Sequence, residues 1–162
     1  MRLALTVPFN HLFSSNVSGP WQYVDEEAQM KPVTQKYLHE AGETLQKTRQ
    51  EFLETNSMNA SLCERAFASG VELTVKAYEF EATGQISHTH AISTISQSCS
   101  LWNLLPSSLQ AAINEWAPFD PNVRYPDTQQ YYTLVNSIGP DQADRMTTKA
   151  LELHSFVSKL VT

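Results

Sequence analysis

The sequence has little cysteine, few basic residues and no long apolar run, and each shortage excludes a class of protein. Its two cysteines, Cys63 and Cys99, have no CxxC spacing. They therefore support neither a disulfide framework nor a zinc site, and we expect buried thiols. The 11 Lys and Arg residues against 17 Asp and Glu residues, a formal net charge of −6, argue against a protein that grips duplex DNA. No apolar run approaches the ~20 residues that span a bilayer, which argues against a membrane protein.

Common enzyme signatures are missing as well. The chain contains no GxxxxGK[ST], GxGxxG, HExxH or GxSxG pattern, which removes the usual nucleotide hydrolases, dehydrogenases, metalloproteases and esterases. No cofactor is expected. The apolar run after Arg2 is interrupted at Pro8, well before signal-peptide length, so we expect a cytoplasmic protein.

The length and the apolar content suit one folded domain with an appended arm. The chain has 162 residues, of which 41% are hydrophobic, enough to bury a core. Residues 1–33 differ from the rest, because apolar residues alternate along their first segment and a turn-rich stretch follows. We expect this N-terminal arm to pack on the helical domain that follows, and the arm is long enough to contain a short β-hairpin. Residues 34–162 form the predicted helical domain.

From Thr34 onward the apolar residues recur at helical spacing. The pattern predicts an all-α fold, an up-and-down bundle of about five helices. Gly84 is a good left-handed terminator for the second of these helices. In chain order, the predicted helices begin at Thr34, at Asn59 or Ser61, near Thr89, at Pro106 and after Gly139-Pro140.

A four-residue turn, Arg124-Tyr125-Pro126-Asp127, is the strongest candidate for a ligand site. Pro126 restricts its own φ and favours an extended Tyr125, so Arg124 and Asp127 project from a stiff loop. Binding residues collect on such loops. We expect residues 124–140 to form the longest irregular connection, and long irregular loops are often functional. The structural alternative is that Arg124 and Asp127 pair with each other or with neighbouring helix ends.

Glu72 and Lys76 lie four residues apart in the predicted second helix, in the order that favours an ion pair. Because Val71, Leu73 and Val75 surround them, we expect the pair to be partly buried, where charges need partners. The structural alternative is an ordinary surface salt bridge.

His88 and His90 flank Thr89 at the predicted start of the third helix. Residues two apart point to different sides of a helix, and no carboxylate stands at metal-ligand spacing, so no metal site is expected. A histidine at a helix N-terminus can contact a phosphate. The structural alternative is a capping or core histidine.

Taken in chain order, these residues resemble the HEPN family of small helical domains, named for nucleotide binding in higher eukaryotes and prokaryotes. The resemblance covers about residues 35–160 and leaves the N-terminal arm outside. It rests on the ordered spacing of the run AFASGVELTVKA at residues 66–77, Gly84, Thr89-His90-Ala91-Ile92, Leu105-Pro106 and the turn at residues 124–127.

Matched by position, Glu72 and Lys76 correspond to the family's helix-two glutamate and lysine, and His90 to its histidine after threonine. Arg124 to Asp127 correspond to its turn. The chain departs from the family pattern at four positions on or near the polar site. Leu73 replaces a second lysine, Ser69 and Gly70 replace glutamines, and Ala91 replaces the aspartate after the histidine.

The resemblance implies a bundle that is frequently a homodimer and that binds nucleotides, cuts RNA or partners a small nucleotidyltransferase. The ribonuclease branch has an arginine followed four to six residues later by a histidine. No arginine here has a histidine at that spacing, since Arg145 and His154 are nine residues apart. Metal-independent RNA cleavage is therefore disfavoured.

Three interpretations follow. The leading one is a non-catalytic nucleotide- or RNA-binding module, in which Arg124 and Lys76 contact phosphates and Tyr125 offers a stacking face. The second is a dimeric interaction subunit that partners a nucleotidyltransferase, with the turn as a structural clasp. The third, ranked last, is an RNA-cleaving toxin in which Arg124 and His90 converge. The candidate ligand-binding residues are Lys76, His90, Arg124, Tyr125 and Asp127, supported by Glu72 and His88.

Overall fold

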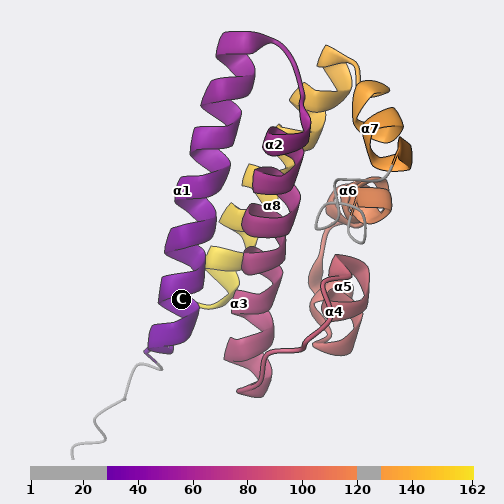
Figure 1. The fold of residues 1–162 in the computed structure, drawn as a ribbon. Coiled ribbons are helices and arrows are strands. Elements are labelled where there is room, and N and C mark those ends of the chain that lie inside the picture. The colour runs from indigo at the N-terminus through magenta and orange to yellow at the C-terminus, as the bar shows by residue number, and fades with distance from the viewer. Residues whose placement is uncertain (1–28, 120–128) are drawn as a thin grey trace, which may run out of the picture.

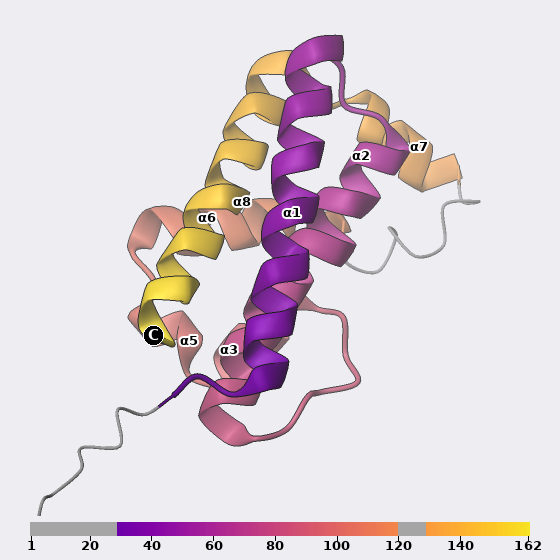
Figure 2. The same ribbon diagram turned by 90° about the vertical axis from the view of Figure 1, so that its left-hand side faces the viewer.

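The computed structural model describes residues 29–119 and 129–162, and this part of the chain is all-α, as predicted. The β-hairpin expected in the arm lies outside the described residues. Long helical segments build the body and pack side by side (Figures 1 and 2). They are α1 (Pro32–Thr55), the continuous segment α2 (Ala60–Cys63), η1 (Glu64–Val71) and α3 (Glu72–Thr83), and α8 (Pro140–Leu160).

Shorter helices cover the side of the body away from α1 (Figure 1). In chain order they are α4 (Ile92–Ser98), α5 (Leu101–Leu104), α6 (Ser107–Trp116), the 3-10 helix η2 (Ala117–Phe119) and α7 (Gln129–Asn136). α4 and α5 contact α3, α6 contacts α8, and α7 contacts α2. No helix within the described ranges is long and apolar enough to cross a bilayer.

Helix α1 follows its sequence pattern closely. One stripe of it faces the other helices, and its opposite side is charged. The backbone leaves the helix at Asn56, whose φ of 48° is left-handed and whose N–H donates to the Phe52 carbonyl. The buried residues of the stripe are Thr34, Leu38, Ala41, Gly42, Leu45, Thr48 and Phe52.

Two glycines let α1 approach its neighbours. A Cβ on Gly70 of η1 would lie 2.6 Å from Leu45 Cγ, and a Cβ on Gly42 would lie 3.0 Å from the His154 ring. Contacts that close leave no room for a side chain. His154 in turn bonds through Nε2 to the Leu38 carbonyl at 2.8 Å, so α1 and α8 are joined where they cross.

The start of α1 and the end of α3 cap one another. The Glu81 carboxylate accepts hydrogen bonds from the Lys31 N–H at 3.1 Å and from Thr34 Oγ1 at 2.6 Å. The Lys31 ammonium donates to the carbonyls of Phe80, at 3.3 Å, and Glu81. An anion at a helix N-terminus and a cation at a C-terminus both complement the helix dipoles. This exchange fixes one end of α1 against α3.

One predicted loop contains a helix. Residues 124–140 were expected to be irregular, but α7 occupies Gln129–Asn136. Tyr131 and Val135, four residues apart, are both buried, and the Tyr131 hydroxyl donates to the Ala60 carbonyl at 2.9 Å. Flanking Pro126 and Gly139 favoured a loop interpretation, whereas packing on α2 stabilises the helix.

The third predicted helix begins later than expected. It was placed near Thr89, but α4 starts at Ile92, with the extended Ala91 as its N-cap. His88 and His90 therefore lie in the connection before the helix and do not cap it. Ser100, with a left-handed φ of 64°, then separates α4 from α5, a helix that the apolar pattern did not predict.

Both cysteines are buried free thiols, as expected. Burial raises the pKa of the Cys63 thiol to about 12. Burial also raises the pKa of Cys99, and the nearby Glu79 carboxylate adds to that rise. Each thiol is thus held in its neutral form.

Candidate functional site

Three charged residues are buried on one face of α3. Glu72, Lys76 and Glu79 are 4%, 7% and 6% exposed, and they recur at the spacing of one helix face. They are the only buried charged residues in the ranges that the structure describes. We refer to them as the α3 stripe. A buried charge is costly unless it is paired, so the partners of the α3 stripe define the site.

Glu72 joins Lys76 to His90. Its Oε1 lies 3.0 Å from Lys76 Nζ and 2.8 Å from His90 Nδ1. The expected ion pair is therefore formed and is buried. The His90 side chain is 39% exposed, so one edge of its ring is held while the ring still reaches solvent. A carboxylate only accepts, so Nδ1 carries the hydrogen of this bond and Nε2 is left to bind another group.

Glu79 holds the same connection at a second point. It accepts hydrogen bonds from the Ser87 N–H at 3.0 Å and from Ser87 Oγ at 3.2 Å. The α3 stripe thus fastens residues 84–91 at Ser87 and at His90. His88 lies between these two anchors and is exposed. The connection holds His90 in place while His88 points to solvent.

A π-helical segment precedes the α3 stripe. In η1 the hydrogen bonds span five residues, as shown by the Glu72 N–H, which donates to the Phe67 carbonyl. π-Helical turns are uncommon and occur frequently at functional sites. Each such turn contains more residues than an α turn, so η1 changes the direction in which Glu72 and the rest of the stripe point. The predicted helix was continuous, and nothing in its apolar spacing indicated this change.

The structure brings together three of the predicted site residues: Glu72, Lys76 and His90. The Lys76 side chain is 9% exposed and bonded to Glu72. Lys76 is therefore better placed to hold Glu72 in position than to bind a phosphate directly. His88 lies nearby in sequence but outside this cluster. Arg124, Tyr125 and Asp127 lie outside the described residues, so their role stays a prediction.

Sequence reasoning missed Glu79 and Ser87. Glu79 follows Glu72 by seven residues, which places both on one helix face, and that spacing was a usable signal. Ser87 had no signal, because its bond to Glu79 depends on the path of the connection. No group of three His, Cys, Asp or Glu residues that could hold a metal ion is present in residues 29–119 and 129–162.

No protein-family model matches the chain, and comparisons with curated proteins and with solved structures give no match. The HEPN resemblance therefore rests on the residues quoted for it and stays a prediction. The function has to be argued from the α3 stripe and the connection that it holds.

Proposed function

We propose that the chain is a non-catalytic, HEPN-type helical module that binds a nucleotide or RNA, with His90 as a contact to the ligand. The observation that supports it is the half-exposed His90 ring held at 2.8 Å by the buried Glu72 carboxylate. A side chain that is already oriented loses little conformational entropy when a ligand binds. Residues 84–91, anchored twice to α3, supply that orientation.

The charges around His90 suit an anionic ligand. Lys76 neutralises Glu72 at 3.0 Å, so a phosphate near His90 does not meet an uncompensated carboxylate. A protonated imidazole would donate from Nε2 to a phosphate oxygen in a charge-assisted hydrogen bond. In this proposal Lys76 acts through Glu72 and does not touch the ligand.

The predicted turn completes the proposed site. Arg124 would bind a phosphate with its guanidinium, and Tyr125 would stack on a base. Asp127 would orient the turn or accept a hydrogen bond from the ligand. These roles come from the sequence pattern alone, so Arg124 needs a variant of its own in the binding experiment.

The test is a thermal shift assay against nucleoside triphosphates and short RNA. A ligand at 100 times its Kd should stabilise the wild type by about 2.7 kcal/mol. His90→Ala and Arg124→Ala should lose this shift. His88→Ala, which removes an exposed histidine two residues away, is the matched control and should keep it. Unchanged melting with every ligand, or a full shift in His90→Ala, would refute the proposal.

A second candidate is an interaction subunit that partners a small nucleotidyltransferase, with homodimerisation as its assembly state. The burial of Lys76 and Glu72 favours it, because the pair fastens a connection and presents little charge to solvent. In that case no ligand shifts the melting temperature, and Arg124→Ala lowers it strongly because the turn is a structural clasp.

A further inference from the structure

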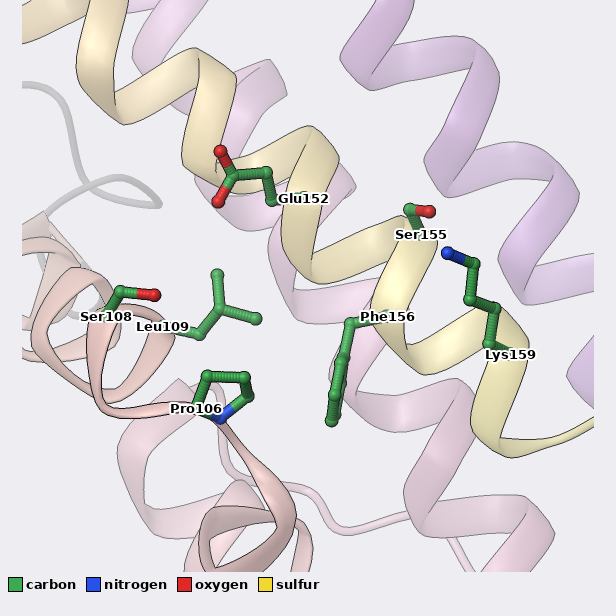
Figure 3. A pocket seen from close by; sticks show the side chains of 7 residues that line it. All are labelled: Pro106, Ser108, Leu109, Glu152, Ser155, Phe156 and Lys159. Atoms are coloured by element: carbon green, nitrogen blue, oxygen red, sulfur yellow. The ribbon is translucent and has the colours of Figure 1, made fainter.

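A groove of about 330 Å³ lies between α6 and α8. In Figure 3 the side chains of Leu109 and Phe156 point into the space between the two helices, with Pro106 at its edge. Glu152 and Lys159 also line the groove, seven residues and about 10 Å apart along α8. The groove therefore has an apolar middle and a charged residue toward each end. We refer to it as the α6–α8 groove.

The two charged residues of the groove differ in their partners. Lys159 is the only lysine or arginine in the described ranges whose side chain makes neither a hydrogen bond nor an ion pair. Glu152 is bonded to Lys149 through Oε2. The α6–α8 groove thus offers an unpaired positive charge at one end, while the negative charge at its other end is already neutralised. An acidic group fits the Lys159 end.

The described part of the chain begins at the Lys159 end of the molecule. α1 and α8 run antiparallel and are joined by the bond of His154 Nε2 to the Leu38 carbonyl. From that bond each helix continues for six residues, about 9 Å, to the start of α1 and to the end of α8. Figures 1 and 2 accordingly show the C-terminus and the start of α1 at the same end of the molecule. Residues 1–28, which precede the described part, are therefore attached close to Lys159.

The last part of this preceding segment has the chemistry that complements the groove. It contains an acidic run, Asp25-Glu26-Glu27, and two aromatic residues, Trp21 and Tyr23. Counted from the attachment point, the acidic run comes first and the aromatic residues follow. In the α6–α8 groove, Lys159 comes first from the same end and Phe156 follows. The order of charged and aromatic groups is thus the same in both.

We propose that residues 21–27 bind in the α6–α8 groove of the same chain. The acidic run lies against Lys159, and the two aromatic residues pack on Phe156, so that apolar area of both leaves water. The length of chain allows this, because four extended residues, from Asp25 to Gln29, span about 13 Å, whereas packed helices are about 8–10 Å apart. Attachment to the same chain also keeps the segment at a high effective concentration beside the groove.

The charges set the direction in which the segment lies. With the acidic run at Lys159, the residues that reach Glu152 come from residues 14–24, none of which is charged. The reverse direction would set the acidic run beside Glu152, and like charges repel each other. The negative end of the groove therefore selects the same direction as the attachment point does.

Exposed apolar side chains also single out this groove. Leu160 is 41% exposed and follows Phe156 by four residues, so the two share one face of α8. Leu104, just before α6, is 49% exposed. The other two large apolar side chains that are exposed in the described ranges are Leu53 and Tyr132, in the last turn of α1 and in α7, at the opposite end of the molecule (Figure 1). The exposed apolar surface within reach of the segment is thus the surface beside the groove.

This inference does not rest on a ligand at His90. The groove is formed by α6 and α8, whereas His90 is held by α3, so either proposal can fail alone.

Chymotrypsin cleavage of the full chain tests the proposal, because the protease cuts after aromatic residues. Trp21 and Tyr23 lie within the proposed bound segment, whereas Phe9 and Phe13 lie outside it. A synthetic peptide of residues 1–29 gives the intrinsic cleavage rate at each site. Relative to this peptide, the full chain should be cut at least about fivefold more slowly after Trp21 and Tyr23, and at a nearly unchanged rate after Phe9 and Phe13.

Charge reversal tests the role of Lys159. Lys159→Glu should remove most of the protection within the bound segment, because an attraction becomes a repulsion. A variant that adds Asp25→Lys, Glu26→Lys and Glu27→Lys to this change exchanges the charges and should restore the protection. Lys36→Glu makes the same charge change on exposed α1, also near the attachment point, and should leave every cleavage rate unchanged.

Circular dichroism on each variant shows whether the helices are retained. Wild-type cleavage after Trp21 and Tyr23 at the rate of the peptide would overturn the proposal and leave the groove to a different partner. An equal loss of protection in Lys36→Glu and Lys159→Glu would also overturn it. So would a charge-exchanged variant that has intact helices and no restored protection, because the acidic run would then not face Lys159.

Discussion

The inner face of α3 and the outer face of α1 contain the same type of ion pair in opposite environments. Glu72 and Lys76 are four residues apart, 3.0 Å from each other, with side chains 5% and 9% exposed. Lys36 and Glu40 are also four residues apart, at 3.8 Å, with side chains 69% and 47% exposed. An exposed pair contributes little to stability, whereas breaking a buried pair leaves an uncompensated charge. Identical spacing in sequence therefore has very different energetic consequences.

The two lysines Lys76 and Lys159 extend this contrast to function. Lys76 is buried and bonded to Glu72, so its charge is used within the fold. Lys159 is exposed and has no side-chain partner among the described residues, so its charge is open to a group outside that part of the chain. Lys76 therefore supports the candidate site on α3, whereas Lys159 is part of the exposed surface of α8.

The largest predicted effect comes from removing one buried charge. Lys76→Met should lower the free energy of unfolding by about 3–5 kcal/mol, because Glu72 stays buried without its ammonium partner. Lys36→Met, the matched change on α1, should cost less than about 0.5 kcal/mol. Urea denaturation of both variants measures the difference. Equal losses would mean that burial does not distinguish the two pairs.

A loss of stability of intermediate size is expected from a substitution that disturbs the packing of η1 against α1. Gly70→Ala should destabilise by about 1–3 kcal/mol, because the added Cβ would collide with Leu45, which is itself buried. Gly139→Ala, where a Cβ meets nothing within 4 Å, is the control and should change stability much less. Denaturation midpoints measure both. The double variant Gly70→Ala/Leu45→Ala tests the cause. If it is more stable than the sum of the two single losses predicts, the collision between the added Cβ and Leu45 is confirmed.

The smallest predicted effect concerns a buried ionisable group that has no opposite charge to pair with. Burial raises the pKa of Cys63 from an ordinary 9.0 to about 12. Above pH 9 the unfolded chain loses this proton while the folded chain keeps it, so stability falls as the pH rises from 9 toward 12. By pH 10 the loss attributable to Cys63 should be on the order of 1 kcal/mol.

Comparison with Cys63→Ala isolates this contribution. The variant should lose less stability between pH 8 and pH 10 than the wild type, as measured by urea denaturation at each pH. Parallel curves would show that the thiol ionises equally in the folded and unfolded chains. Tyr131, whose pKa burial also raises, contributes to the slope of both proteins and cancels in the comparison.

Much of the fold could be predicted because its signals are local. The stripe of α1 was visible as apolar spacing, and the start of α2 as a capping residue, since Asn59 Oδ1 accepts the Leu62 N–H at 3.0 Å. Gly84 ends α3 with a φ of 73°, as expected for a left-handed terminator. These features depend on residues within four positions of each other, so they appear in the sequence itself.

The exceptions depend on contacts between distant segments. α7 forms where Tyr131 packs on α2, 71 residues away in sequence. The π-helical η1 occurs where Gly70 meets Leu45 of α1. Helix propensity depends only on neighbouring residues and does not reflect either contact. Neither element was therefore predicted from the sequence.

In the candidate site, the pairing of Glu72 with Lys76 follows from the amino-acid sequence, because helical geometry sets residues four apart side by side. The burial of this pair, the bond from Glu72 to His90 18 residues later and the bond between Glu79 and Ser87 all depend on how distant segments pack. The two groups of features differ in how far apart along the chain the interacting residues lie. A helix and its ion pairs are made by neighbouring residues, whereas burial and the path of a connection are set by how α1, α3, α4 and α8 pack together.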